Sequence, residues 1–273
     1  PGLSRFRVNT YRQRGSLAAV IRVIAFELPD PGILNIPEDV MSVSDFTKGM
    51  VLVTGPAGSG KSTTMACIVD RINHSREGHI ITLEDPLEYL HRHDKCIVSQ
   101  REICTDTESY LVSLRATLRQ SPDVILLGEM RDYETIQTAM TAAETGHLIL
   151  SSLHTTGAAN TIGRIVDVFE PAQQRQISIQ LSMVLQAVIS QQLIPDINGH
   201  TIPAFEVMRL NPAIRNMIRD NKVHQIDGVI ASSAHEHMRS MDQSLLELYK
   251  QNKITKETAL KFASNADMLK RKL

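Results

Sequence analysis

The sequence has no tryptophan, few other aromatic residues and only three cysteines, and these shortages narrow the possible functions. Aromatic residues make up 4% of the 273 residues, and 29 basic residues nearly balance 30 acidic ones. Proteins that bind nucleic-acid strands combine aromatic stacking with a basic groove, so we expect no nucleic acid as a partner. Cys67, Cys96 and Cys104 are odd in number and lack a CxxC spacing. This pattern favours a reducing compartment and argues against a zinc site.

Long hydrophobic runs and a secretory leader are also lacking. No apolar run approaches the roughly 18 residues that cross a bilayer, and no signal-peptide pattern is present. The apolar fraction of 42% is ordinary for a globular protein of one large or two modest domains. The chain starts at Pro1, without methionine, directly in strand-like sequence. We therefore expect that an N-terminal part of the protein precedes it.

Residues 51–64 carry the clearest chemical signal. They read VLVTGPAGSGKSTT, which fits a strand, a glycine-rich turn with GxxxxGK[ST] spacing and the start of a helix. Backbone N–H groups of such a turn, and the helix N-terminus, bind phosphate oxygens. Lys61 is expected to reach the β- and γ-phosphates of ATP or ADP, and the Ser62 hydroxyl to bind Mg²⁺. The predicted nucleotide-binding residues of this loop are Gly55, Pro56, Ala57, Gly58, Ser59, Gly60, Lys61, Ser62 and Thr63.

Strand-like and helix-like segments alternate along the middle of the chain. This alternation predicts an α/β fold with a mostly parallel sheet covered on both faces. The expected strands are 79–83, 124–127 and 147–151, and the expected helices are 63–73, one opened by a capping box at 105–108, and one from Asp132 to Glu144. Four strands end at residues 55–62, Glu84-Asp85, Glu129 and His154. Ligands bind beyond the carboxyl ends of such strands, so we expect one shared site there.

The two ends of the chain have a different character. Alternating segments at 5–12 and 17–25 predict a β-hairpin, and the prolines of 27–37 indicate a linker. A helical pattern starts at Pro171 and includes Leu185 and Val188. We divide the chain into an N-terminal remnant (1–26), a linker (27–40), an ATPase core (41–195) and a mainly helical C-terminal region (196–273) that contains a strand at 201–207.

Acidic residues at two strand ends are candidates for the chemistry. Glu129 follows four apolar residues and a glycine, where a Walker-B strand presents its acid. It is assigned as general base or as the group that orients the attacking water; capping the next helix is the structural alternative. Glu84 and Asp85 are candidates to hold Mg²⁺ through water or to position the same water. Forming the turn before Pro86 is their alternative role.

A histidine and two arginines are weaker candidates on these grounds. His154, at a strand end, is placed to bond the γ-phosphate and so report its presence, although a lone histidine is more often structural. Arg115 and Arg119 are four residues apart on one predicted helix face. They form either a solvated surface or a clamp on transition-state charge.

Four motifs, in order, resemble those of the secretion-type hexameric ATPases, and within that family the branch that retracts type IV pili. They are ITLEDPLEY at 81–89, similar to the Asp box; LLGEMRD at 126–132, to Walker B; TGHLILSSLHTT at 145–156, to the His box; and AIRNMIRD at 213–220, to a signature of the retraction branch. The resemblance covers nearly the whole chain. One departure is Ser121, which stands where the family usually has an acid, and this puts any role of that position in doubt.

The resemblance implies a RecA-like P-loop motor domain and a PAS-like N-terminal domain, of which about residues 3–25 are present. It implies a homohexameric ring that binds ATP or ADP with Mg²⁺ at the cytoplasmic face of the inner membrane and acts on a pilus platform protein. By the same resemblance, Glu129 is the catalytic glutamate, Glu84 the Asp-box acid and His154 the His-box histidine. Arg115 and Arg119 match phosphate-sensing arginines, while Arg7 and Arg22 match arginines that the N-terminal domain offers to the nucleotide.

Other functions remain open at this stage. An assembly or secretion ATPase of the same superfamily is the nearest alternative, although those enzymes usually carry a four-cysteine zinc module. A RecA-like nucleic-acid translocase is more remote, given the balanced charge and the few aromatics. A factor that binds ATP without hydrolysing it is disfavoured because Glu129 is in place.

Overall fold

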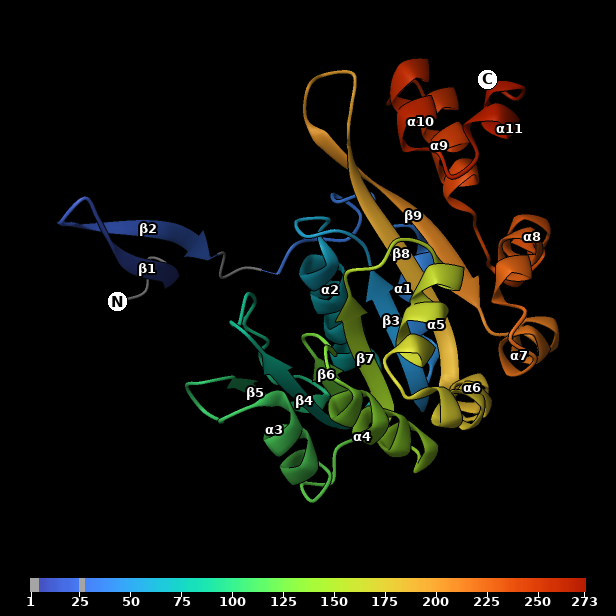
Figure 1. Ribbon diagram of the computed structural model, residues 1–273. Helices are drawn as coiled ribbons and strands as arrows, with labels where there is room; N and C mark the ends of the chain where they lie inside the picture. Colours follow the sequence, from blue (N-terminus) through green and yellow to red (C-terminus); the bar gives the residue numbers. More distant parts are fainter. Residues whose placement is uncertain (1–4, 25–27) are drawn as a thin grey trace.

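A seven-stranded sheet forms the centre of the computed structural model, which describes residues 5–24 and 28–273 (Figure 1). The strand order is β5-β4-β6-β7-β3-β8-β9. Its members are β3 (Gly49–Thr54), β4 (Gly78–Glu84), β5 (Cys96–Glu102), β6 (Val124–Leu127), β7 (Leu148–Leu153), β8 (Leu185–Pro195) and β9 (Thr201–Arg209). All neighbouring strands are parallel except β8 and β9, which form an antiparallel hairpin.

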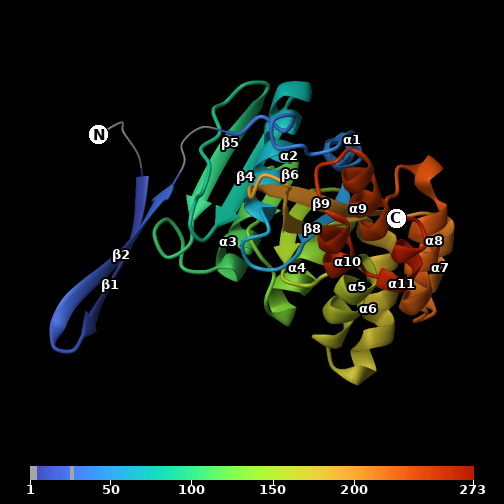
Figure 2. The same ribbon diagram turned by 90° about the horizontal axis from the view of Figure 1, so that it is seen from above.

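Helices cover both faces of this sheet (Figures 1 and 2). The α-helices are α1 (Glu38–Met41), α2 (Lys61–Ser75), α3 (Tyr110–Thr117), α4 (Tyr133–Glu144), α5 (Ala158–Asp167), α6 (Pro171–Val184), α7 (Pro212–Arg219), α8 (Ile226–Ser232), α9 (Met241–Lys250), α10 (Lys256–Phe262) and α11 (Ala266–Lys270). Short 3-10 helices span Ser42–Asp45, Val223–Gln225 and Ala234–Glu236. Among the described helices, none combines the length and the apolar character that a membrane span requires.

Alternate residues of each strand supply two separate cores. In β3, Met50 and Leu52 pack with α3 to α8, whereas Val51 and Val53 pack with α1 and α2. Successive side chains of a strand point to opposite faces, so a run of apolar residues fits a strand buried on both sides. The apolar runs of the predicted strands therefore form the middle layer of three, and the predicted α/β class is confirmed.

Two local predictions are wrong. Helix α3 begins at Tyr110, and its N-cap is Ser109, whose hydroxyl accepts from Val112 N. Residues 105–108 do not cap it, because the Asp106 carboxylate instead accepts the N–H of Glu102 at 2.8 Å and holds a turn. The helical pattern from Pro171 also ends earlier than expected. Leu185 has extended backbone angles and begins β8, since pairing with β3 supplies its backbone hydrogen bonds.

The flanking regions attach to the sheet differently. The hairpin of β1 (Arg5–Gln13) and β2 (Ser16–Ile24) projects away from the core (Figure 2). Ala25, the expected end of its second strand, and the expected domain boundary between residues 26 and 27 lie outside the residues that the structure describes. At the other end, α9 to α11 pack on the far part of the β8–β9 hairpin. Because β9 pairs with β8, the central sheet continues past residue 195, the expected end of the ATPase core.

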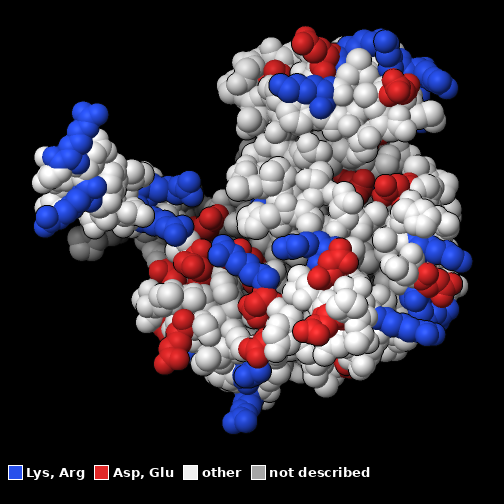
Figure 3. All heavy atoms as spheres, in the orientation of Figure 1, with Lys and Arg blue, Asp and Glu red and all other residues white. Residues whose placement is uncertain are grey.

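Charges are mixed on the face of the molecule drawn in Figure 3. Basic side chains gather on the β1–β2 hairpin, and acidic ones gather on the adjoining part of the core. Elsewhere on that face the two signs are interspersed. This face therefore presents no continuous basic groove of the kind that tracks a nucleic-acid strand.

Candidate functional site

The four strands whose ends carry the predicted site residues are neighbours in the sheet. Their order is β4-β6-β7-β3, so Glu84, Glu129, His154 and the loop that holds Lys61 leave the same edge side by side. The ends are also tied together: Gly128 N donates to Leu83 O at 2.8 Å. Four adjacent carboxyl ends form the crevice that α/β proteins use for ligands.

The loop between β3 and α2 has the backbone shape of a phosphate cradle. Gly55, Gly58 and Gly60 all have positive φ angles, which residues with a side chain rarely adopt. A Cβ atom on Gly55 would also lie 2.2 Å from the carbonyl oxygen of Gln191. Helix α2 then begins at Lys61, so its N-terminus points its free N–H groups into the loop.

Gln191, on β8, packs against this loop and against the first turn of α2. Its side-chain oxygen accepts a hydrogen bond from Thr64 Oγ1 at 2.7 Å, and both side chains are buried. Its amide nitrogen would lie 2.8 Å from a Cβ on Gly60. The amide therefore fixes the first turn of α2 against the sheet and leaves room for glycine only at position 60.

We expect Gln191→Leu to destabilise the protein. Leucine fills a similar volume but leaves the buried Thr64 hydroxyl without its partner, which costs about 1–3 kcal/mol. For a chain of this size, that lowers Tm by about 2–4 °C per kcal/mol. Calorimetry checks the prediction, with Gln176→Leu on the exposed side of α6 as the control. Equal Tm values for the two variants would contradict the supporting role of Gln191.

The ammonium of Lys61 lies at the centre of the loop. It donates to the carbonyl oxygens of Gly55 and Pro56, each at 2.9 Å, and lies 3.5 Å from Nδ1 of His154. Burial lowers the pKa of Lys61, and the Glu129 carboxylate partly offsets this effect. The lysine is thus held where phosphate oxygens of a nucleotide would replace the two loop carbonyls as acceptors.

His154 links Lys61 to Glu129. Its Nε2 lies 3.5 Å from Glu129 Oε2, while its Nδ1 faces Lys61. An ammonium is a donor only, so Nδ1 accepts and the ring proton sits on Nε2, toward the carboxylate. The other oxygen of Glu129 lies 2.6 Å from the guanidinium of Arg131. Lys61, His154 and Glu129 are therefore brought into one cluster.

Glu84 lies beside this cluster rather than within it. Burial raises the pKa of its carboxyl to about 7, against which the Gln100 amide acts, with its Nε2 3.5 Å from Glu84 Oε1. Tyr110, at the start of α3, lies beside Gly128, the residue before Glu129: its hydroxyl would be 2.7 Å from a Cβ on Gly128. Burial raises the pKa of Tyr110, and the carboxylates of Glu129, Asp85 and Glu84 raise it further.

The two hairpin arginines lie at a second part of the same edge. Arg7 and Arg22 are directly opposite each other on β1 and β2. With Pro86, Glu88 and Tyr89 they line a cavity of about 230 Å³. The Tyr89 hydroxyl lies 2.9 Å from Thr63 Oγ1, so this cavity adjoins the start of the phosphate-loop helix.

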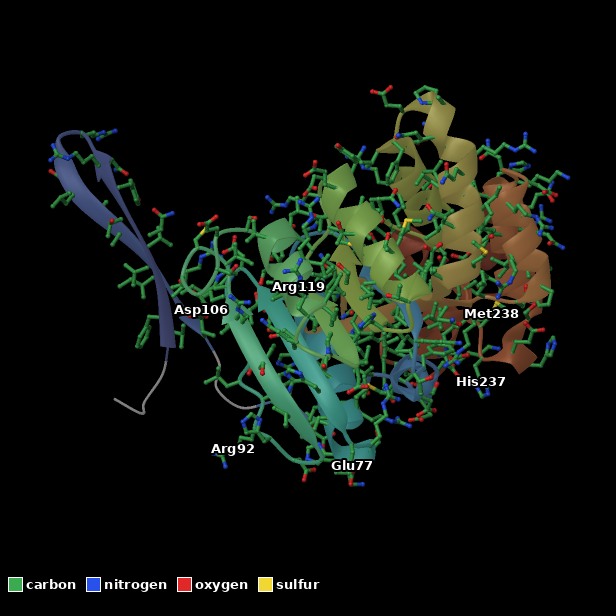
Figure 4. The ribbon with its side chains drawn as sticks, turned by 90° about the horizontal axis from the view of Figure 1, so that it is seen from below. Glu77, Arg92, Asp106, Arg119, His237 and Met238 are labelled. Atoms are coloured by element: carbon green, nitrogen blue, oxygen red, sulfur yellow. The ribbon has the colours of Figure 1, made fainter. Side chains whose placement is uncertain are left out.

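Arg115 and Arg119 are not brought to the cluster. Both are exposed on or just after α3, and within residues 5–24 and 28–273 neither side chain makes a hydrogen bond or ion pair. Figure 4 shows Arg119 at the end of that helix. The structure therefore assigns these two arginine side chains no contact with Lys61, His154 or Glu129 among the described residues.

Comparison with known proteins agrees with this geometry. The family described as type II/IV secretion system protein matches residues 5–271. The type IV pilus retractation ATPase PilT of Pseudomonas aeruginosa is 47% identical over 259 residues, which are 95% of this chain and 75% of that protein. A twitching motility protein of Neisseria gonorrhoeae is 44% identical over 270 residues, 98% of this chain and 72% of that one. The chain belongs to the type II/IV secretion system protein family.

A solved member of the family has the same architecture. The crystal structure of the pilus retraction motor PilT with bound ADP matches with a TM-score of 0.92 and 48% identity, over 99% of this chain and 77% of that one. The predicted membership in the family, and the likeness to its retraction branch, are confirmed. This chain is accordingly a nucleotide-binding protein, as its phosphate loop indicates.

Oxygen donors at the site suit magnesium. A serine hydroxyl at Ser62 and a partly buried carboxylate at Glu84 are the ligand types that Mg²⁺ takes in phosphate-loop proteins, together with phosphate oxygens and water. No cluster of three or more His, Cys, Asp or Glu side chains fit to hold a metal occurs among the described residues. A site that uses one or two carboxylates plus the substrate does not need such a cluster.

Several residues of the site were not predicted from the sequence. Gln191 contacts the phosphate-loop helix, Arg131 contacts Glu129, and the Tyr110 hydroxyl lies beside Gly128. Arg131 lies within the Walker-B motif, two residues from Glu129, so its spacing was a usable signal. Gln191 lies in the polar stretch 190–192 between apolar residues of the same strand, and a polar group buried in a strand needs a hydrogen-bond partner.

Proposed function

We propose that this chain hydrolyses ATP and uses the energy to retract type IV pili. The observation that carries the proposal is the cluster of Lys61, His154 and Glu129, linked at 3.5 Å on adjacent strand ends beside a glycine-rich loop. Support for retraction comes from two relatives, a pilus retractation ATPase and a twitching motility protein, that are 47% and 44% identical.

Lys61 binds the β- and γ-phosphates of ATP. Its ammonium exchanges the carbonyl oxygens of Gly55 and Pro56 for phosphate oxygens, which are stronger acceptors because they are charged. The N–H groups of residues 55–63 surround the phosphates. Arg7 and Arg22 approach the nucleotide from the hairpin side, since their cavity adjoins Thr63 through Tyr89.

Glu129 activates the water that attacks the γ-phosphorus. As the new P–O bond forms and the bond to ADP breaks, the carboxylate orients the water and accepts its proton. Before this step Glu129 must exchange its contact with Arg131 for the water. His154 binds the γ-phosphate, and its Nε2 contacts Glu129. Loss of the phosphate therefore changes the position of His154 relative to the carboxylate.

Magnesium, when bound, would neutralise charge on the phosphates, held by Ser62 and, through water, by Glu84. The charged form of Glu84 suits this role, and a nearby cation would oppose the effect of burial on its pKa. Asp85 stands next to Glu84 and belongs to the same turn.

The working assembly is a homohexameric ring. In such a ring Arg115 and Arg119, exposed and without partners among the described residues, reach the phosphates bound by a neighbouring subunit. The ring acts on a pilus platform protein of the inner membrane and lies at its cytoplasmic face, held there by partner proteins. We keep the division into hairpin remnant, linker, ATPase core and C-terminal region as part of this proposal, with β9 (Thr201–Arg209) counted in the sheet of the core.

We expect Arg115→Ala to lower kcat by about 10³-fold, the smaller end of what an arginine finger contributes. Binding of ATP by the same subunit is expected to stay normal. Turnover and nucleotide affinity measured on the purified protein check this. Arg92→Ala is the control, because Arg92 is also exposed but lies far from α3 (Figure 4). An Arg115→Ala protein with the kcat of the unchanged protein would assign this arginine to the solvated surface.

The cellular experiment is deletion of the gene. Cells that keep pili which no longer shorten are the expected result. Cells that lose their pili or a secreted protein would indicate an assembly or secretion ATPase instead. In the purified protein, stimulation of turnover by DNA would indicate a translocase.

A further inference from the structure

A buried acid, Glu206, lies in β9 well away from Lys61 and Glu129 in the sequence. Its side chain is 6% exposed, and it is directly opposite Ser190 on β8. An ionised carboxylate is costly to bury unless several donors bind it. Its neighbours in the sequence, Phe205 and Val207, are apolar and buried, so a charged group at this position calls for a specific reason.

Glu206 and Ser190 together bind the backbone just after the His box. The N–H of Gly157 donates to Ser190 Oγ, and the next N–H, of Ala158, donates to Glu206 Oε1, both at 2.9 Å. Ala158 begins α5. Only residues 155 and 156 separate His154 from these two hydrogen bonds. A displacement of His154 therefore reaches the two bonds through a short stretch of backbone.

The strand that carries Glu206 is also tied to the start of α9: Phe205 N donates to Ser244 Oγ at 3.1 Å, and Val207 pairs with Arg239, two residues before that helix. Burial raises the pKa of Glu206, and the backbone N–H groups of Ala158 and Met241 oppose this by stabilising its charged form. Met241 is the first residue of α9, whose N-terminus is also fixed by a capping box between Ser240 and Gln243. Glu206 and its two neighbours in β9 therefore connect this strand to the helix that follows the His box and to the first of the C-terminal helices.

Open space adjoins the parts that Glu206 and its neighbours connect. A cavity of about 600 Å³ is lined by Glu206, by Thr156 and Gly157 of the turn, by Met241 at the start of α9, and by Met268 of α11. The turn and the C-terminal helices thus face a common cavity, and Glu206 in its wall binds the turn through Ala158.

We propose that Glu206 is a positioning residue that transmits the nucleotide state from the His154 turn to the C-terminal helices α9 to α11. The proposal rests on the proposed function, because it requires His154 to respond to the γ-phosphate. When the turn at 155–157 shifts, the N–H of Ala158 moves with it. The carboxylate then moves relative to Met241 and reorients the start of α9.

Hydrogen exchange of the whole chain tests this, with Mg²⁺ and a non-hydrolysable ATP analogue as the probe. In the unchanged protein we expect the analogue to slow exchange in residues 55–65 and to alter it in residues 241–250. In Glu206→Gln the first effect is expected to remain and the second to disappear. Turnover is expected to fall by about 2–30-fold at unchanged KM, the range for coupling through a packed network.

Two further variants make the test specific. Ser190→Ala removes the acceptor of the adjacent N–H and is expected to weaken the change at 241–250, which keeps the proposal testable if Glu206→Gln does not fold. Glu257→Gln makes the same substitution on the exposed side of α10 and is expected to change nothing. An unchanged response of 241–250 in well-folded Glu206→Gln would overturn the proposal. Absence of any analogue effect at 55–65 in the unchanged protein would instead overturn the proposed function.

Discussion

Replacing Lys61 by alanine is expected to abolish tight nucleotide binding. The ammonium now holds two carbonyl oxygens of its own loop at 2.9 Å, and ATP offers charged oxygens in their place. Hydrogen bonds that involve a charged group contribute about 1.5–3 kcal/mol each. Losing two of them corresponds to an affinity for ATP at least about 100-fold weaker. Titration with a fluorescent ATP analogue measures the change directly.

The control for this variant separates binding from folding. Lys61 is largely buried, so its removal also frees the carbonyls of Gly55 and Pro56. Thermal unfolding of Lys61→Ala without nucleotide therefore accompanies the titration. Lys48→Ala removes an equal charge at an exposed position before β3 and is expected to bind ATP normally. An affinity of Lys61→Ala within a few-fold of the unchanged protein would contradict the phosphate-loop assignment.

The centre of the site was predictable because its signals are local. A strand, a glycine turn and a helix start occupy 14 consecutive residues, 51–64, and the chemistry of phosphate binding fixes their spacing. Glu84, Glu129 and His154 each follow an apolar run. In a parallel sheet the ends of such runs share one edge, so topology brings them together without any need to know the strand order.

The boundary between α6 and β8 was not predictable in the same way. Leu185 and Val188 continue the helical spacing of Ile177 and Leu181, and all four belong to the same core. Periodicity cannot distinguish a buried strand from the continuation of a buried helix. The strand forms because β3 offers unpaired backbone groups to it, and that partner is more than 130 residues away in the sequence.

Contacts between distant segments were missed for a related reason. Gln191 and Glu206 are polar residues buried within strands, and each binds a backbone or hydroxyl group of a helix start. The residue type signals that some partner exists, but only the packing of α2 and α5 against the sheet shows which one. For Arg115 and Arg119 the reverse holds. Their sequence motif resembles that of phosphate-sensing arginines, but their side chains have no partner among the described residues.

Replacing Glu129 by glutamine is expected to separate binding from hydrolysis. The amide has nearly the same shape as the carboxylate but cannot accept a proton from the attacking water, so kcat is expected to fall by about 10²–10⁴-fold. Lys61 and the loop N–H groups are untouched, so affinity for ATP is expected to stay within a few-fold. A quenched-flow measurement of a single turnover, beside the titration used for Lys61→Ala, checks both expectations.

Two other variants show whether the loss of turnover in Glu129→Gln comes from the missing proton acceptor. Glu77→Gln makes the same change at an exposed position before β4, at the opposite end of the sheet, and is expected to leave turnover intact (Figure 4). Glu129→Gln also removes the ion pair with Arg131, so Arg131→Ala shows how much that contact restrains the free enzyme. If Arg131 only holds Glu129 before ATP binds, Arg131→Ala retains turnover while Glu129→Gln loses it. Unchanged hydrolysis by Glu129→Gln would move the proton-accepting role to another group, of which Glu84 is the nearest candidate at the same edge.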